Sequence, residues 1–395
     1  MTETALIWDS LIWDSLIWGG LIWGGLAALP LFALAMTLLN LATWPRGRND
    51  GAFDGRVSVL VPARDEAETI EACVRAILDG AHPVDELLVY DDQSTDATPQ
   101  ILARLCDEYD ELRVVEARPL PTGWVGKPHA CHRLAEAATG DLLVFVDADT
   151  LLSDDGLSRI ASLFEDKEAD LVTAVPRQKS VGFAERLVLP LLHLTYTSWF
   201  PLLLVWRSQD PRFLAANGQC LGLRREALEA IGGFESVRSD VVDDMALCRR
   251  AKEAGRRVVF ADGFDMATCR MYGSAGQLWQ GFSKNLYEGI GAHPLALAAI
   301  VAIYSGAFIA PYVGLGAALA IPGAAWLLVP ALIGVGANLL LRIALAWRFR
   351  QPWEGVLLHP VGVLALLAIA VNSFRWHVGD TIEWAGRTYS RKSRR

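Results

Sequence analysis

The sequence predicts an α/β domain with a mostly parallel sheet, set between apolar transmembrane helices near the two ends of the chain. Residues 50 to about 285 carry charges throughout and alternate strand-like with helix-like patterns, which is typical of a parallel sheet. The flanking stretches are almost uncharged over lengths that can cross a bilayer. Hydrophobic residues make up 52% of the 395 residues, more than a soluble domain usually carries. We therefore expect a membrane protein with one soluble domain.

The charge balance argues against nucleic acid as a partner. The chain has 36 basic and 45 acidic residues, a net charge of −9, whereas phosphate backbones are bound by clustered Lys and Arg. The six cysteines form no C-x-x-C pair and have no histidine spacing typical of zinc. We expect reduced, buried thiols.

Composition divides the chain into four parts. An N-terminal membrane anchor precedes a soluble domain, which is followed by C-terminal transmembrane helices and a basic tail; these parts span residues 1–45, 46–290, 291–378 and 379–395. The anchor begins with the repeat LIWDS LIWDS LIWGG LIWGG, whose tryptophans spiral around a helix at five-residue spacing. The repeat is either a duplication without chemistry or an interfacial Trp belt.

The charges around the first apolar stretch predict its orientation. Glu3, Asp9 and Asp14 precede it, and Arg46 and Arg48 follow it. The positive-inside rule then places the soluble domain on the cytoplasmic side of the cell (inner) membrane. Three further apolar stretches would leave the basic tail outside, so we expect one of them to be re-entrant.

A further apolar stretch, LVLPLLHLTYTSWFPLLLV (187–205), lies inside the soluble domain. If it crossed the membrane once, the acidic motifs before and after it would lie on opposite sides. We expect this segment to lie in the membrane interface, which suits Trp199, Tyr196 and His193. A buried hairpin is the alternative.

Apolar runs and helix signals predict the elements of the sheet. Strands are expected at VSVLVPA (57–63), at ELLVY (86–90) and in DLLVFV (141–146). Helices are expected over residues 66–80, ended by Gly80, and over 128–140, from Pro128 to Gly140.

Acidic residues follow two of these strands. Asp91 and Asp92 end the second strand, and Asp147 and Asp149 end the later one. Ligands of open parallel sheets bind at the carboxyl ends of the strands, so these acids converge on one crevice. Gathering carboxylates costs free energy unless a cation compensates them. The pattern therefore predicts Mg²⁺ or Mn²⁺ holding a phosphate oxygen, although turn capping explains acids such as Asp96.

Two further motifs complete the predicted site. Neither a G-x-G-x-x-G nor a P-loop motif is present, so a diphosphate would instead meet GWVGKPHA, where Lys127 precedes a helix. Asp243 and Asp244 open another helix, whose dipole keeps a carboxylate ionised. An ionised Asp244 can take a proton from an acceptor hydroxyl, while capping is the alternative role for Asp243.

In order and spacing, these motifs resemble glycosyltransferase family 2, with its GT-A fold. The resemblance covers residues 55 to 290 and rests on VSVLVPARDE, LLVYDDQSTDAT, GKPHA, FVDADT, NGQCLGLRREALEAIGGF and VDDMALCRRAKEAGRRV. GWVGKPHA, DDMAL, GFSKNL and WAGRTY are most similar to the hopene-associated and carotenoid glycosyltransferases of membranes.

The resemblance implies a nucleotide site. Asp92 would bind the uracil of a UDP-sugar, and Pro62, Arg64 and Glu66 would line the nucleotide. Lys127 would lie near the diphosphate.

It also implies the catalytic groups. Asp147 and Asp149 would form the D-x-D metal site, with Asp149 the closer ligand. Asp244 would be the base of an inverting transfer, and residues 217–234 would border the acceptor.

The sequence departs from the family pattern at two places. Asp243 and Asp244 stand where the family has Glu-Asp, and QLWQGFSKN (277–285) stands where processive synthases have Q-x-x-R-W. We expect an inverting, metal-dependent enzyme that moves a hexose from a UDP-sugar to a membrane lipid, of isoprenoid, carotenoid or ceramide-like type, at the cytosolic face. The alternatives are a processive polysaccharide synthase and an inactive binding or transport protein.

Overall fold

The computed structural model describes residues 24–379, 382–384 and 387–389. The pentapeptide repeat lies outside the described residues except for its last two glycines, and so does most of the basic tail. The chain forms two compact units. The described parts of 43–182, 201–291 and 372–395 make the larger one, and the described parts of 1–42, 183–200 and 292–371 make the smaller one.

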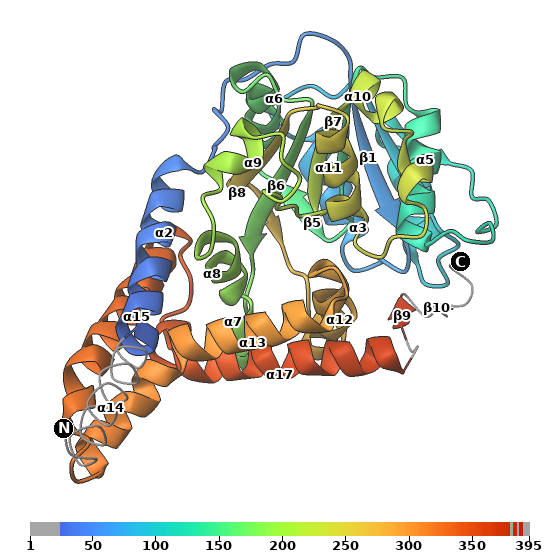
Figure 1. The fold of residues 1–395 in the computed structure, drawn as a ribbon. Coiled ribbons are helices and arrows are strands. Elements are labelled where there is room, and N and C mark those ends of the chain that lie inside the picture. Colours follow the sequence, from blue (N-terminus) through green and yellow to red (C-terminus); the bar gives the residue numbers. More distant parts are fainter. Residues whose placement is uncertain (1–23, 380–381, 385–386, 390–395) are drawn as a thin grey trace, which may run out of the picture. The chain divides into compact units, whose positions relative to one another are not determined.

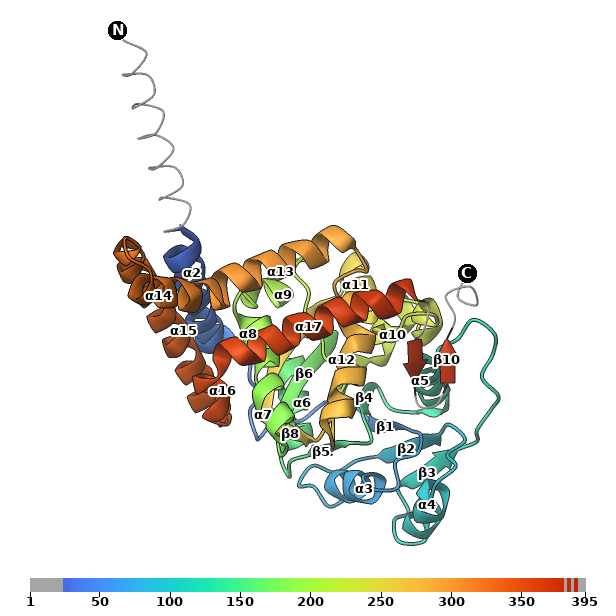
Figure 2. The same cartoon turned by 90° about the horizontal axis from the view of Figure 1, so that it is seen from below.

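The larger unit is built on an eight-stranded sheet of order β3-β2-β1-β4-β7-β6-β8-β5. Figure 2 shows β3, β2 and β1 side by side. The strands are β1 (Val57–Ala63), β2 (Glu86–Asp91), β3 (Leu112–Val115), β4 (Leu142–Val146), β5 (Thr150–Leu152), β6 (Leu171–Gln178), β7 (Cys220–Arg224) and β8 (Val258–Cys269). A separate antiparallel pair is formed by β9 (Ile382–Trp384) and β10 (Arg387–Tyr389).

The sheet is mostly parallel, as predicted. β1 pairs in parallel with β2 and β4, β2 with β3, and β6 with β8. Only β7 and β5 run antiparallel to their neighbours in this sheet. The central strands are buried on both faces, which explains their uninterrupted apolar sequences.

Helices cover the sheet (Figure 1). α5 packs against β1 and β2, and α6 packs against β6 and β8. The helices of this unit are α3 (Ile70–Leu78), α4 (Thr98–Cys106), α5 (Gly126–Ala137), α6 (Gly156–Asp166), α9 (Leu203–Arg207), α10 (Arg225–Ala230), the 3₁₀ helix η2 (Phe234–Val237), α11 (Asp243–Glu253) and α12 (Ala275–Gly289).

Two predicted helix boundaries were wrong. α3 begins at Ile70 because the preceding residues form a turn in which the amides of Thr69 and Ile70 both bind the carbonyl of Glu66. α5 begins at Gly126, so Lys127 lies in its first turn and does not precede it. Pro128 is tolerated there because amides of the first helical turn need no partner within the helix.

The smaller unit consists of helices. They are the π-helical turn η1 (Gly24–Ala28), α2 (Leu29–Thr43), α7 (Phe183–Val188), α8 (Leu191–Thr197), α13 (Pro294–Phe308), α14 (Ala310–Ala320), η3 (Ala325–Leu327), α15 (Leu328–Arg348), α16 (Glu354–Leu357) and α17 (His359–Val378). Thr43 and the last residues of α17 belong to the larger unit. α14 and α15 pack along each other and against η1.

Several of these helices are long and apolar enough to cross a membrane. In the described chain, three pass this test alone, Gly25–Thr43, Ala325–Arg348 and His359–Val378, and α12 with α13 passes only as a bent pair. α15 keeps large apolar side chains on its surface, among them Leu340, Ile343 and Trp347. A surface of this kind suits a lipid environment.

The segment 187–205 forms short helices and no single span. Its apolar side chains are mostly buried, and His193, expected near headgroups, is buried too. Asn40 donates to the carbonyl of Thr197 (2.8 Å), and the Thr195 hydroxyl lies 3.1 Å from the Tyr304 hydroxyl. The alternative of a buried hairpin describes these contacts better, while the interfacial position stays a prediction.

Candidate functional site

Acidic residues gather at the carboxyl ends of three neighbouring strands. β1 lies between β2 and β4, so the loops after these strands open on the same edge. Asp92 follows β2, and its amide donates to the carbonyl of Ala63 at the end of β1 (2.8 Å). Asp147 and Asp149 follow β4. The convergence predicted from the sequence is therefore present at this edge.

Hydrogen bonds connect the loops that follow β1 and β2. Asp65 (φ 55°) and Gln93 (φ 59°) both adopt the left-handed conformation. Asp65 accepts from the Thr95 amide (2.7 Å), and the Ala67 amide donates to Asp96 (2.9 Å). Asp96 thus ties loops together, in line with its predicted capping role.

The residues predicted to line a nucleotide lie on this edge. Pro62 is in β1, and Arg64 follows it. Arg64 donates to the carbonyl of Asp92, and its Nη1 is 3.9 Å from Asp92 Oδ2. Asp92 is almost fully buried. Asp92, the residue predicted to bind the nucleotide base, is thus held at this edge of the sheet in contact with Arg64.

Glu66 belongs electrostatically to the acidic cluster. Burial raises its pKa to about 7, and Asp149, Asp147 and Asp96 raise it further, while the Thr69 hydroxyl, 2.7 Å away, opposes the shift. A carboxyl with this pKa is partly protonated at neutral pH, which limits the repulsion in the cluster.

Lys127 pairs with the first aspartate of the D-x-D motif. Its Nζ lies 2.5 Å from Asp147 Oδ1 and 3.3 Å from the carbonyl oxygen of Gly218. Burial alone would lower the pKa of Lys127, but Asp147 and Asp243 raise it overall. Lys127 therefore stays charged, and α5 fixes it beside Asp147.

In the described chain, no cation pairs with Asp149 as Lys127 pairs with Asp147. Burial and the neighbouring Asp147 raise its pKa to about 6. The Thr150 hydroxyl donates to Asp149 Oδ1 (3.1 Å), and the Cys269 thiol also faces this carboxylate. Its negative charge is therefore only partly compensated by the described residues.

The start of α11 brings two more acids to the same place, as the sequence predicted. Asp243 is buried, and this burial raises its pKa to about 7 against the effect of Lys127. Asp244 is half-buried and accepts from the Met245 amide (2.8 Å), and burial raises its pKa as well.

Gly218 allows this approach. A β-carbon there would lie 3.3 Å from the Asp244 β-carbon and 3.4 Å from Lys127 Nζ. A side chain at this position would be in tight contact with Asp244 and in contact with Lys127.

Sequence analysis missed the thiols behind the acids. Five of the six cysteines interact electrostatically with the aspartates of the cluster: Cys73, Cys131, Cys220, Cys248 and Cys269. All five are buried free thiols, as expected, and Cys106 is partly exposed. Burial is the main cause that raises their pKa values, so they add no negative charge. Their spacing gave no signal because they come from different elements.

Tyr272 was also missed. It follows β8 and lies close enough to Asp149 for the carboxylate to help raise the pKa of its hydroxyl, after burial. Asp262 and Asp265 interrupt the apolar pattern of VVFADGFDMATC, so neither β8 nor the tyrosine that follows it had a clear signal in the sequence.

The donor set fits a hard cation completed by a substrate. Within the described residues, no three histidine, cysteine or acidic side chains are grouped so as to hold a metal by themselves. Asp147 and Asp149 nevertheless offer the carboxylate oxygens that Mg²⁺ and Mn²⁺ prefer, and such ions take further ligands from phosphates and water. Of the two, Asp149 is the carboxylate whose charge is less compensated by the described residues.

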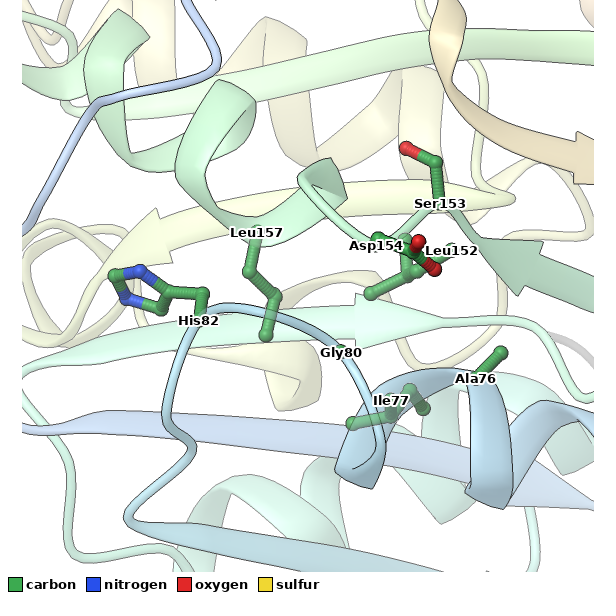
Figure 3. A pocket seen from close by; sticks show the side chains of 8 residues that line it. All are labelled: Ala76, Ile77, Gly80, His82, Leu152, Ser153, Asp154 and Leu157. Carbon is green, nitrogen blue, oxygen red and sulfur yellow. The ribbon is translucent and has the colours of Figure 1, made fainter.

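A small hollow lies elsewhere in the larger unit (Figure 3). It lies between α3, β5 and α6, with His82, Asp154 and Leu157 among its lining residues, and its empty space, open solvent included, is about 160 Å³. This volume is below that of ordinary small-molecule sites, and none of the acids predicted to act lines it. We assign it no role in binding.

Comparisons with known proteins agree with the fold and the motifs. The family described as "Glycosyltransferase like family 2" matches residues 55–277. A beta-monoglucosyldiacylglycerol synthase of Nostoc is 30% identical over 49% of this chain and 40% of its own length, so the chain spans less than half of that relative. A 4,4'-diaponeurosporenoate glycosyltransferase of Staphylococcus aureus is 26% identical over 85% of this chain and 88% of its own.

Among solved structures, the mannosyltransferase PcManGT of Pyrobaculum calidifontis, in complex with GDP-Man and Mn²⁺, is similar in fold. The similarity covers 88% of this chain and 99% of that chain, with a TM-score of 0.50 and 22% identity. The sheet order, the edge that gathers the acids and the matched family lead to one assignment, which the sequence had predicted: the chain belongs to glycosyltransferase family 2 and has the GT-A fold.

Proposed function

We propose that this glycosyltransferase moves a hexose from a UDP-sugar to a hydroxyl or carboxyl group of a membrane lipid, with inversion at the anomeric carbon. The observation that carries the proposal is the cluster in which Lys127 links Asp147 to the start of α11, with Asp244 across Gly218. This arrangement would put a base and a leaving-group site within reach of one bound substrate.

The donor side of the site would be formed by the loops after β1 and β2. We propose that Asp92 and Arg64 hold the uracil end, with Pro62 and Glu66 along the nucleotide. Lys127 would face the diphosphate from the first turn of α5, where helix amides also favour an anion.

Asp149 would bind a divalent cation directly, with Asp147 held beside it by Lys127. A bound Mg²⁺ or Mn²⁺ would neutralise charge on the leaving diphosphate. Asp149 and Asp147 would orient this end of the donor. The bound cation would also relieve the repulsion between these two carboxylates that is present in the free protein.

Asp244 would act as the base. As the bond between the anomeric carbon and the diphosphate oxygen breaks, the acceptor oxygen attacks from the opposite side, and its proton passes to the Asp244 carboxylate. A carboxyl acceptor already ionised needs no such transfer. The raised pKa of Asp244 suits a base at neutral pH, since its ionised form is less stabilised than that of an exposed aspartate.

Two observations support a lipid acceptor. Relatives of this chain are named for a glucosylated diacylglycerol and for diaponeurosporenoate. The chain also carries three apolar helices of membrane-spanning length in its described part. We propose a multi-pass protein of the cell membrane, with residues 46–290 as the catalytic domain on the cytoplasmic side.

The proposal is tested with membranes that contain the full chain. They are incubated with radiolabelled UDP-glucose, UDP-galactose, UDP-N-acetylglucosamine and GDP-mannose in the presence of Mn²⁺, and the lipids are extracted. We expect label in the organic phase with one UDP-sugar, and a product of β configuration by NMR if the donor is α-linked.

The matched control is the Asp244→Asn chain at equal expression, which should leave the organic phase unlabelled. Label found only in water-soluble polymer would contradict the lipid acceptor, and a product that retains the donor configuration would contradict inversion.

A further inference from the structure

The apolar unit contains a buried arginine that lacks a counter-ion. Arg342 lies within α15 and is fully buried. Its Nη1 is 3.4 Å from the carbonyl oxygen of Pro190, a long contact, and its Nε and Nη2 have no hydrogen-bond partner in the described chain. No described carboxylate lies within 4.0 Å of this guanidinium. A positive charge is thus enclosed almost without compensation.

Two other side chains of the same unit have buried polar atoms without a partner in the described residues. Both ring nitrogens of His359, at the start of α17, and the hydroxyl of Tyr312, in α14, are buried without a partner in the described residues. Each lies close enough to Arg342 to interact with it electrostatically. The Tyr312 hydroxyl and one ring nitrogen of the neutral His359 are therefore unused hydrogen-bond donors near the guanidinium.

Acceptors are scarce at the same place. Gln351 Nε2 contacts the same Pro190 carbonyl (3.5 Å) and lies 3.3 Å from His193 Nδ1. Gln351 Oε1 is an unpartnered acceptor, but a neutral oxygen does not balance a guanidinium. The surplus of donors and positive charge matches an oxyanion with two or more acceptor oxygens.

The helix α16 comes close to the guanidinium at a glycine. Gly355 in α16 has no side chain where a β-carbon would lie 3.2 Å from Arg342 Nη2 and 3.0 Å from the carbonyl oxygen of Arg186. The glycine lets α16 approach the unpaired edge of the guanidinium without covering it by a side chain.

A buried cation without a counter-charge is unfavourable in an apolar environment, so a ligand that pairs with it recovers much of that free energy. The outer face of α15 exposes Leu340, Ile343 and Trp347, which suits contact with lipid. We therefore expect an anion that reaches Arg342 from the lipid side to carry an apolar chain.

We propose that Arg342, with His359 and Tyr312, binds the oxyanion head of an anionic lipid, a carboxylate or phosphate attached to an apolar chain. The site belongs to the apolar unit and does not depend on the sugar transfer proposed above.

The test uses the full chain in a neutral detergent and follows its thermal unfolding. Oleate and phosphatidic acid should raise the melting temperature by several degrees, whereas phosphatidylcholine should not, because a ligand bound only by the folded state stabilises it. Inorganic phosphate and acetate should give less than a third of that rise. An equal rise with the free anions would overturn the lipid assignment.

Arg342→Met is the decisive variant. We expect it to lose the rise with anionic lipid and to melt, without lipid, no lower than the parent, because an unpaired charge has been removed. A lower melting temperature without lipid, together with a retained rise, would show a structural arginine and overturn the proposal. If Arg342→Met does not fold, Arg342→Lys is used instead. It keeps the charge but loses the planar, multi-donor guanidinium, so the rise in melting temperature with anionic lipid should be at least threefold smaller than in the parent.

Arg350→Gln is the matched control, since Arg350 is an exposed arginine of the same unit. It should keep the full rise. A loss equal to that of Arg342→Met would mean that lipid binds by general surface charge, which contradicts a site.

Discussion

The acidic cluster contains less positive than negative charge. Lys127 contacts Asp147 and is electrostatically coupled to Asp243, while the hydrogen bonds to Asp149 and Glu66 in the described chain come from hydroxyl or thiol groups. Burial is the main cause that raises the carboxyl pKa values, and the repulsion between the acids adds to it. Four of the aspartates were predictable because Asp147 and Asp149 follow an apolar strand and Asp243 and Asp244 open a helix, whereas Glu66 was expected only from the family resemblance. The burial of these acids was not predictable, since it depends on what packs against them.

Asp243→Asn should make the protein more stable at neutral and alkaline pH. Burial raises the pKa of Asp243 to about 7, so the folded state binds a proton that the unfolded state releases above pH 4. The parent is therefore penalised progressively from about pH 4 to 7, and asparagine carries no such penalty. We expect equal melting temperatures near pH 4 and an advantage of a few degrees for the variant at pH 8.

Asp110→Asn provides the control, because Asp110 is exposed in a turn. Its melting temperature should follow that of the parent at every pH. If Asp243→Asn melts below the parent at pH 8, then Asp243 is stabilised as a carboxylate and the assigned direction of its pKa shift is wrong.

Among the elements, the strands with uninterrupted apolar sequences were predicted and β8 was not. Asp262 and Gly263 interrupt its apolar run. In the folded chain Asp262 is buried and pairs with Arg46 at 3.1 Å, and it also accepts from the Phe264 amide. A partner more than 200 residues away thus makes an acidic strand position acceptable, and no local pattern reveals it.

The contact between α15 and η1 depends on a glycine. A β-carbon at Gly334 would lie 1.9 Å from the carbonyl oxygen of Leu26 and 2.9 Å from Pro311. Small residues of this kind let helices in membranes approach closely. Gly334→Ala should therefore force the two elements apart and destabilise the apolar unit by about 1–3 kcal/mol, measured as a lower melting temperature in detergent.

Gly336→Ala is the comparison on the same helix. A β-carbon there meets nothing within 4 Å, so alanine should be neutral or slightly stabilising through its helix propensity. Equal effects of the two substitutions would mean that the contact with η1 does not limit stability.

For the whole molecule, composition alone distinguished the charged domain from the apolar helices. It did not reveal that residues 183–200 join the apolar unit. That assignment rests on contacts such as Asn40 with Thr197, which connect parts of the chain 157 residues apart. Hydropathy reports the preference of a segment for an apolar environment, and it does not say whether protein or lipid provides it.

The central claim is that Asp149 and Asp244 serve one bound nucleotide sugar. It is tested most directly by the release of UDP from UDP-sugars by the purified full chain in detergent with Mn²⁺, comparing Asp149→Asn, Asp244→Asn and Asp141→Asn. Asp141 lies just before β4, at the opposite end of the strand from Asp149, and is exposed.

We predict that Asp141→Asn and the parent release UDP equally and that a metal chelator stops both. Asp244→Asn should be slower by about 10²-fold or more, the typical contribution of a general base. Asp149→Asn should lose its response to Mn²⁺. Release at the parental rate by both Asp149→Asn and Asp244→Asn would contradict the account.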